Sequence, residues 1–251
     1  MIIAILSFIF LTSVFTSSVQ ATPQSDYEYQ LTQYRKYNTE FKSLKEDNQK
    51  NPTLDNQQKA LQAAKQTIIS RDQTKIAYID VILDSIRSQG LTQDHILQTE
   101  QDLVNAKAFY GSQITLVKEI VSVTDLTNFT IEYLADQLPH QTQIIRSLAT
   151  KKFAELIRIQ LNANNAYNIL LPKIPNKTQT PVSAGLTKIT KLAESINNNI
   201  LSSVYTIKTS EITVSNSKNF YKKQTENLIQ VRDIQLELVN TLIDLEKNYA
   251  N

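Results

Sequence analysis

The chain has 251 residues, among them no Cys, no Trp, two His, three Gly and six Pro. Three glycines, where ordinary usage would give about 17, are too few for the turns of a β-sandwich, a barrel or a doubly wound α/β fold, so the composition predicts an all-α protein. The lack of Cys excludes disulfides and Cys-ligated metals, and the net charge of +2, with basic and acidic residues interspersed, is not typical of a nucleic-acid-binding protein.

The first 21 residues have the pattern of a signal peptide. The apolar run Ile2–Leu11 is followed by a Ser- and Thr-rich stretch, and Val19 and Ala21 are small residues that favour cleavage after Ala21. No Lys or Arg precedes the apolar run, and the uncharged stretch is just long enough to span a bilayer, so an uncleaved anchor is the alternative. The cleaved form predicts a secreted or extracytoplasmic protein, in the periplasm or at the cell surface.

The first helix is predicted over residues 25–48, because apolar and aromatic side chains recur there at helical spacing. This stripe consists of Tyr27, Leu31, Tyr34, Phe41 and Leu44. Tyr29 and Tyr37 fall off the stripe, so we expect them to be a surface for a protein partner if they are exposed. Packing of these aromatic rings into the bundle is the interpretation that the sequence favours.

Two further helices are predicted over residues 53–88 and 92–123, joined by a short turn. The apolar stripe of the first contains Leu61, Ala64, Ile68, Ile76, Ile79, Leu83 and Ile86. Gly90 lies where a left-handed C-terminal cap belongs, so it is expected to end the first of these helices. Gly111 lies inside the second, where it marks either a close approach of two helices or a weak point.

A fourth helix is predicted over residues 125–171, completing a helical bundle over residues 22–171. Pro139 lies within it and is expected to kink the helix or to divide it, because proline cannot donate the backbone hydrogen bond and clashes with the preceding turn. Three prolines then follow within ten residues, which predicts an extended linker over residues 172–182.

The C-terminal region, residues 183–251, is expected to form one long helix, because apolar residues keep a single helical phase with neither Pro nor Gly after Gly185. At about 1.5 Å per residue such a helix would reach about 100 Å. The alternative is a helical hairpin with its turn in the polar stretch Thr209–Ser217. Together these segments predict an elongated, antiparallel, coiled-coil-like bundle of four to six long helices.

Acidic side chains at helical spacing are the candidates for chemistry. Glu132, Asp136 and His140 follow one another at intervals of four residues, a pattern that can hold a divalent metal on one helix face. Pro139 disturbs that geometry, and no second carboxylate–His pair completes a two-metal site. We therefore expect a solvated face and no metal.

A second acidic group consists of Asp80, Asp84 and Arg87. Paired carboxylates can act as general acid and base, but these lie on the polar side of an amphipathic helix. Asp84 and Arg87 have the spacing of an ordinary pair on a helix surface. The sequence therefore predicts no catalytic residue, no metal and no cofactor.

Part of the chain, over about Tyr27–Ile86, carries a resemblance to a known group. The stretch Tyr27–Tyr37, the segment Lys59–Lys65 and the motif Ser70–Asp72 resemble uncharacterised secreted helical proteins of reduced-genome candidate-phylum bacteria. That group has no assigned activity. The resemblance implies an exported bacterial helical protein and assigns no functional residue.

The sequence favours an exported, non-enzymatic helical protein that acts as a cell-envelope structural or partner-binding module. The signal pattern, the long helices and the shortage of catalytic residue types support this expectation. An extracytoplasmic bundle that senses or binds a small molecule is one alternative, and a protein anchored by its uncleaved N-terminal helix is another. A protein partner or self-association is expected, with no nucleic acid, and with membrane contact only through the N-terminal segment.

Overall fold

The computed structural model of this chain describes residues 22–174, 179–213 and 215–249, so the predicted signal peptide lies outside the described residues. These residues form long helices and no strand, which confirms the all-α bundle. The helices are α2 (Pro23–Lys50), α3 (Leu54–Arg87), α4 (Asp94–Glu119), α5 (Val123–Leu170), α6 (Thr180–Thr209) and α7 (Ser217–Tyr249), with a 3-10 turn, η1, at Leu171–Lys173.

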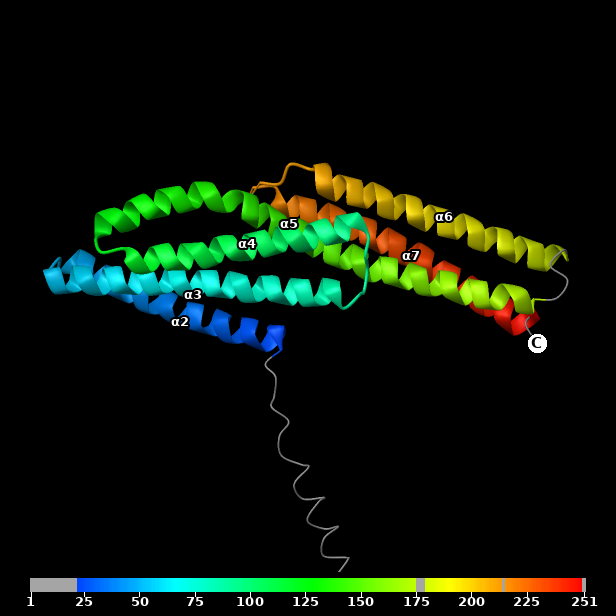
Figure 1. Cartoon of the computed structure of the whole chain (residues 1–251), viewed down its shortest axis with the longest axis horizontal. Coiled ribbons are helices and arrows are strands. Elements are labelled where there is room, and N and C mark those ends of the chain that lie inside the picture. Colours follow the sequence, from blue (N-terminus) through cyan, green and yellow to red (C-terminus); the bar gives the residue numbers. More distant parts are fainter. Residues whose placement is uncertain (1–21, 175–178, 214, 250–251) are drawn as a thin grey trace, which may run out of the picture.

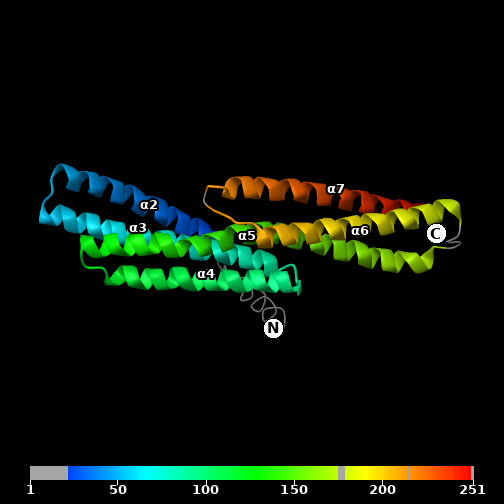
Figure 2. The same cartoon turned by 90° about the horizontal axis from the view of Figure 1, so that it is seen from above.

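The helices form an elongated molecule with two halves that share one helix (Figures 1 and 2). The N-terminal half contains α2, α3, α4 and the first part of α5, whereas the C-terminal half contains the rest of α5 with α6 and α7. Helix α5 has 48 residues and is therefore about 70 Å long. The shared helix makes the molecule a rod.

Short polar side chains begin three of the helices. Ser25 donates its backbone N–H to the Thr22 hydroxyl at 3.2 Å, and Thr53 caps α3 in the same way. At the start of α5, the Ser122 hydroxyl accepts from the backbone of Asp125, whose carboxylate accepts from the backbone of Ser122. These contacts satisfy N–H groups that have no partner inside the helix, so they fix where each helix begins.

The three glycines lie in different environments. Gly90 has a φ of +62°, as expected for a residue that ends a helix in the left-handed region. Gly111 does not mark a close approach, because a Cβ added there meets nothing within 4 Å. The close approach occurs at Gly185, where an added Cβ would lie 2.9 Å from Cδ2 of Leu245. The glycine at the start of α6 therefore lets α7 pack closely against it.

Pro139 does not divide the fourth helix, because α5 continues through it without interruption. The axis of α5 changes direction along its course (Figure 1). Side chains on both sides of the proline are buried, among them Tyr133 and Gln137 before it and Ser147 after it. Packing on both sides offsets the cost of the hydrogen bond that proline cannot make.

The expectation of a single C-terminal helix is wrong, because α6 ends at Thr209 and α7 begins at Ser217. Helix α5 holds the connection: Arg146 Nη2 donates to the carbonyl of Ser210 at 2.7 Å, and the Thr142 hydroxyl donates to the carbonyl of Ile212 at 3.1 Å. The side chains of Thr213 and Asn216 also bond nearby backbone groups and so compete with the helix. The alternative, a helical hairpin, is the observed arrangement.

The segment predicted as a linker is shorter than expected. Residues Leu171–Lys173 form the 3-10 turn η1, and α6 already begins at Thr180 with Pro181 in its first turn. Proline is tolerated there because the first N–H groups of a helix have no intrahelical partner. Val182 is completely buried, so this part of the predicted linker belongs to the core.

Candidate functional site: a buried charged cluster

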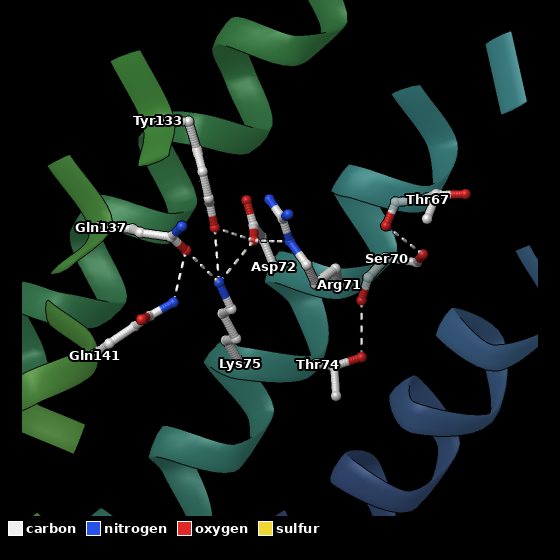
Figure 3. Close-up of polar contacts among 9 residues, drawn as sticks. All are labelled: Thr67, Ser70, Arg71, Asp72, Thr74, Lys75, Tyr133, Gln137 and Gln141. Carbon is white, nitrogen blue, oxygen red and sulfur yellow. Dashed lines mark hydrogen bonds and ion pairs between the residues drawn. The ribbon is translucent and has the colours of Figure 1, made fainter. Parts of the chain in front are cut away.

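Three charged side chains of α3 meet the side chain of a tyrosine from α5 inside the N-terminal half (Figure 3). Asp72 is completely buried, and Arg71 and Lys75 flank it on the same helix. Tyr133 reaches the carboxylate from α5 and is itself buried. We call these four residues the Asp72 cluster.

One carboxylate oxygen receives every contact to Asp72. Its Oδ1 accepts from the Tyr133 hydroxyl at 2.7 Å and from Arg71 Nε at 3.1 Å, and Lys75 Nζ lies 3.6 Å away. Lys75 Nζ also donates to the Tyr133 hydroxyl at 2.7 Å and to Gln137 Oε1 at 3.4 Å. The hydrogen bonds therefore run from the ammonium through the phenol to the carboxylate.

Aromatic rings surround the two cations. The Arg71 guanidinium lies 4.4 Å from the centre of the Tyr133 ring, and Lys75 Nζ lies 4.4 Å from the centre of the Tyr110 ring. A cation over an aromatic face is attracted by the negative face of the ring, and this attraction is larger when water is excluded. Helix α4, which carries Tyr110, is thus tied to the charges of α3 as well as to the apolar core.

Burial dominates the protonation of the cluster. Burial lowers the pKa of Lys75 to about 8, although the nearby Asp72 carboxylate opposes this by favouring the charged amine. Burial, together with the Asp72 charge, raises the pKa of Tyr110 and of Tyr133, so both phenols stay protonated. Tyr133 is therefore a permanent donor to the carboxylate.

Three polar atoms beside these contacts are buried and make no hydrogen bond within the described residues: Asp72 Oδ2, Arg71 Nη2 and Tyr110 Oη. Chemically, the chain of bonds from Lys75 to Asp72 can pass a proton. Physically, it fixes how α3 and α5 pack, because a shift would leave the buried Asp72 carboxylate unpaired at a cost of several kcal/mol.

The sequence prediction missed the Asp72 cluster, although a signal was present. The apolar stripe expected on α3 has a gap between Ile68 and Ile76, and Asp72 fills it at helical spacing. A carboxylate at a core position of a helix needs a polar partner that is also buried. The other residues of the stripe are apolar, so they could not be that partner. That partner, Tyr133, is far away in the sequence, and its identity needs the fold.

The acidic residues predicted on α5 do not gather at one site. Glu132 and Asp136 are exposed, and His140 stacks on the ring of Phe109 with centres 4.2 Å apart. Across the part of the chain that the structure describes, no three His, Asp or Glu side chains are placed to hold a metal ion. His140 packs against α4 instead of sharing a face with two ligands.

The group predicted on α3 lines one groove of about 430 Å³ between α2 and α3, together with Asp26 of α2. Asp80 forms an ion pair with Lys107 of α4 at 2.7 Å. Asp84 is exposed, and the expected pair with Arg87 is replaced by a contact from Arg87 Nε to Glu100 of α4 at 2.9 Å. Both contacts join neighbouring helices near the surface, so they help to fix the alignment of α4 along α3.

The two tyrosines predicted as a partner surface lie on α2, none of whose residues is buried. Tyr29 is 59% exposed. Tyr37 is half-buried and lines a groove of about 600 Å³ between α2 and α3, together with Leu44, Leu61 and Val121 among others. The structure therefore places one tyrosine in solvent and the other in a groove. Their role in binding stays a prediction.

None of the described helices is both long and apolar enough to cross a membrane. Comparison with models of protein families, with curated proteins and with solved structures finds no match for this chain. The resemblance to secreted helical proteins therefore stays a prediction, and functional arguments depend on the geometry alone.

Proposed function

We propose that this chain acts through its surface, as an exported structural or partner-binding module of the cell envelope, and not as an enzyme. The observation that carries this proposal is that α2, a helix of 28 residues, packs on α3 with half-buried side chains and has none that is fully buried. A helix that keeps part of every side chain in solvent is best explained by what it presents outward. The rod shape supports the same function, because a long bundle offers a large surface at small volume.

The distribution of reactive groups also supports a role without catalysis. The Asp72 carboxylate is completely buried, so a substrate could not reach it without opening the bundle. Asp80 is paired with Lys107, and Glu132 and Asp136 are exposed. Asp80 shares a groove with Asp84 and Asp26, but its carboxylate is neutralised by the ion pair with Lys107. Glu132 and Asp136 lie four residues apart on a solvent-exposed face of α5, whereas a catalytic pair needs two groups that face a bound substrate.

The experiment replaces single tyrosines with a photo-cross-linking amino acid in cells that export the protein. Positions 29 and 37 test the α2 surface, and Tyr205 on α6, which is 69% exposed, is the matched control. We expect cross-links to a protein at positions 29 and 37 and none at 205. Mass spectrometry of the N-terminus of the same sample is expected to show a chain that begins at residue 22.

The partner would then be purified and its affinity measured. Replacing Tyr29 and Tyr37 together by Ala is expected to weaken binding by about tenfold or more, because buried tyrosines are frequent hot spots. Tyr205→Ala is expected to leave the affinity unchanged. Equal cross-linking at all three positions, or none at 29 and 37, would contradict the α2 surface.

A further inference from the structure

Helices α5 and α7 enclose an open groove in the C-terminal half, about 470 Å³ in volume. It is lined mainly by apolar side chains, including Ile159, Ala166, Ile169, Val239, Leu242 and Ile243. This groove lies between helices of the C-terminal half, whereas α2, which carries Tyr29 and Tyr37, lies in the N-terminal half (Figure 2). It is therefore a second surface, independent of the one in the proposed function.

The helices that border the groove have apolar residues outside and polar residues inside. Ile169 is 64% exposed and Leu236 is 56% exposed, whereas Gln160, Gln224 and Gln235 are buried. Both amide atoms of Gln224, and the amide oxygens of the other two, make no hydrogen bond within the described residues. These helices leave large apolar side chains in water. Covering their outer face therefore releases more hydrophobic free energy than covering an ordinary surface helix.

The groove runs between parallel helices at a known register. Within the C-terminal half, α5 and α7 both run toward the end of the rod near the C-terminus (Figure 1). Gln235 Nε2 donates to the carbonyl of Leu156 at 2.7 Å, so these two positions lie level with each other. Ile229 on α7 is thus level with Thr150 on α5, and the face from there to Lys173 is about 35 Å long at about 1.5 Å per residue.

Charges at the two ends of this face alternate in sign. Glu155 of α5 and Arg232 of α7 lie toward the middle of the rod, and Lys173 of η1, which follows α5, and Glu246 of α7 lie toward its end. Along each side of the face, the charge at one end is therefore opposite in sign to the charge at the other end. At each end of the face, the charges on the two sides are also opposite in sign. Arg232 and Glu155 contact only residues of their own helices, Asp233 and Lys152, among those described.

This pattern is complementary to itself. If a second copy lies antiparallel on the face, Glu155 meets Lys173 of the copy and Arg232 meets Glu246 of the copy. If the copy lies parallel, Glu155 meets Arg232 and Lys173 meets Glu246. Both two-fold arrangements pair opposite charges around an apolar centre, as an isologous interface requires.

We propose that the α5–α7 groove is the interface of a homodimer, in which it is covered by the same groove of a second copy. The face is about 35 Å long and about 20 Å wide, since each helix is about 10 Å across, which gives about 700 Å². A standard interface buries about 800 Å² on each partner. The face is therefore large enough for a dimer in solution.

Sedimentation velocity of the full chain over a range of concentrations tests this proposal. The expected species has twice the 28.5 kDa mass of one chain. Ile169→Glu combined with Ile243→Glu places charges in the apolar centre and is expected to give the monomer. Leu201→Glu on α6, at a position that is 66% exposed and away from the groove, is the matched control and is expected to stay dimeric.

Charge reversal at exposed positions tests the same interface without touching the core. Arg232→Glu is expected to raise the dissociation constant by about tenfold or more, because it places like charges opposite each other. A second change restores it: Glu246→Arg if the copies are antiparallel, or Glu155→Arg if they are parallel. Helical circular dichroism checks that each variant is folded.

Three results would overturn the proposal. A wild-type chain that is monomeric at all concentrations would exclude the dimer and leave the groove to another occupant. A dimer that survives both the Ile169 and Ile243 changes, or that is lost equally in Leu201→Glu, would place the interface elsewhere. Failure of both second changes to restore the Arg232→Glu variant would exclude the charge pairing.

Discussion

The two halves of the rod bury polar groups in opposite ways (Figure 2). The N-terminal half gathers them in the Asp72 cluster, where three charges and a phenol contact one another and aromatic rings cover the cations. The C-terminal half spreads uncharged amides along the core, at Gln160, Gln224 and Gln235. Of these three, Gln235 is the one whose side chain bonds a residue of another helix.

The difference shows how each half obtains its specificity. A paired charged cluster is intolerant of shifts, so it selects one packing of α3, α4 and α5. A buried amide without a partner gives up hydrogen bonds to water and gains none, so it weakens the core in which it lies. We therefore expect the N-terminal half to be the more rigid and the C-terminal half to depend more on covering its outer face.

The largest effect is expected from Asp72→Ala, which leaves two half-buried cations and the buried Tyr133 hydroxyl without their carboxylate. Breaking a buried ion pair by removing one partner costs about 3–5 kcal/mol in the free energy of unfolding. Denaturation in urea, followed by helical circular dichroism, measures this loss. Asp80→Ala removes the partly exposed pair with Lys107 and is the control, with an expected cost of about 1 kcal/mol or less. Equal losses in the two variants would show that the Asp72 cluster is not special.

The opposite sign is expected from Gln224→Leu in the C-terminal half. Leucine has nearly the same volume and no amide to leave unsatisfied, so the free energy of unfolding should rise by about 1–3 kcal/mol. Gln235→Leu should gain less, because it removes the bond to the carbonyl of Leu156. Hydrogen exchange of α6 and α7 locates the change. A loss of stability in Gln224→Leu would mean that its amide has a partner.

The pH dependence of stability also distinguishes the two halves, because Lys75 lies in the N-terminal half. The expected change in the free energy of unfolding is about 1–2 kcal/mol. Lys75 has a pKa of about 8 in the folded chain and 10.5 as its ordinary value, so the unfolded chain binds more protons between these values. The free energy of unfolding should therefore rise as the pH increases from about 8 to about 10. Above about pH 10 the raised pKa values of Tyr110 and Tyr133 act in the opposite direction. Lys75→Met should abolish the rise, and a rise that persists in that variant would assign it to other groups.

The smallest effects are expected at the two helical glycines. Gly111→Ala should stabilise the N-terminal half by about 0.5–1 kcal/mol, because a Cβ fits there without contact and alanine favours the helix. Gly185→Ala should gain less or lose stability, because its Cβ would press on Leu245 between α6 and α7. Thermal denaturation compares the two. A larger gain at Gly185 than at Gly111 would mean that Leu245 moves aside freely.

Local features of the fold could be predicted from the sequence. Gly90 ends α3 in the left-handed region as predicted, because the preference of glycine for that conformation needs no distant partner. Tyr29 is exposed and Tyr37 is half-buried, although both lie off the apolar stripe, so the stripe alone did not decide their exposure. The environment of Asp72 could be predicted only in part. The gap between Ile68 and Ile76 indicates a polar residue at a core position, but not which residue forms a hydrogen bond with it. Gly111 and Gly185 could not be told apart, because a close approach depends on the neighbouring helix.

By itself, the sequence determined that the protein is helical and where its first four helices lie within a few residues. Those properties follow from helical spacing and from caps, which act between residues three or four positions apart. Only the tertiary structure decided that the C-terminal region folds back at Ser210, where Arg146 and Thr142 of α5 supply donors for the connection. It also decided that Asp72 is buried, because the phenol of Tyr133 comes from a helix sixty-one residues away in the chain.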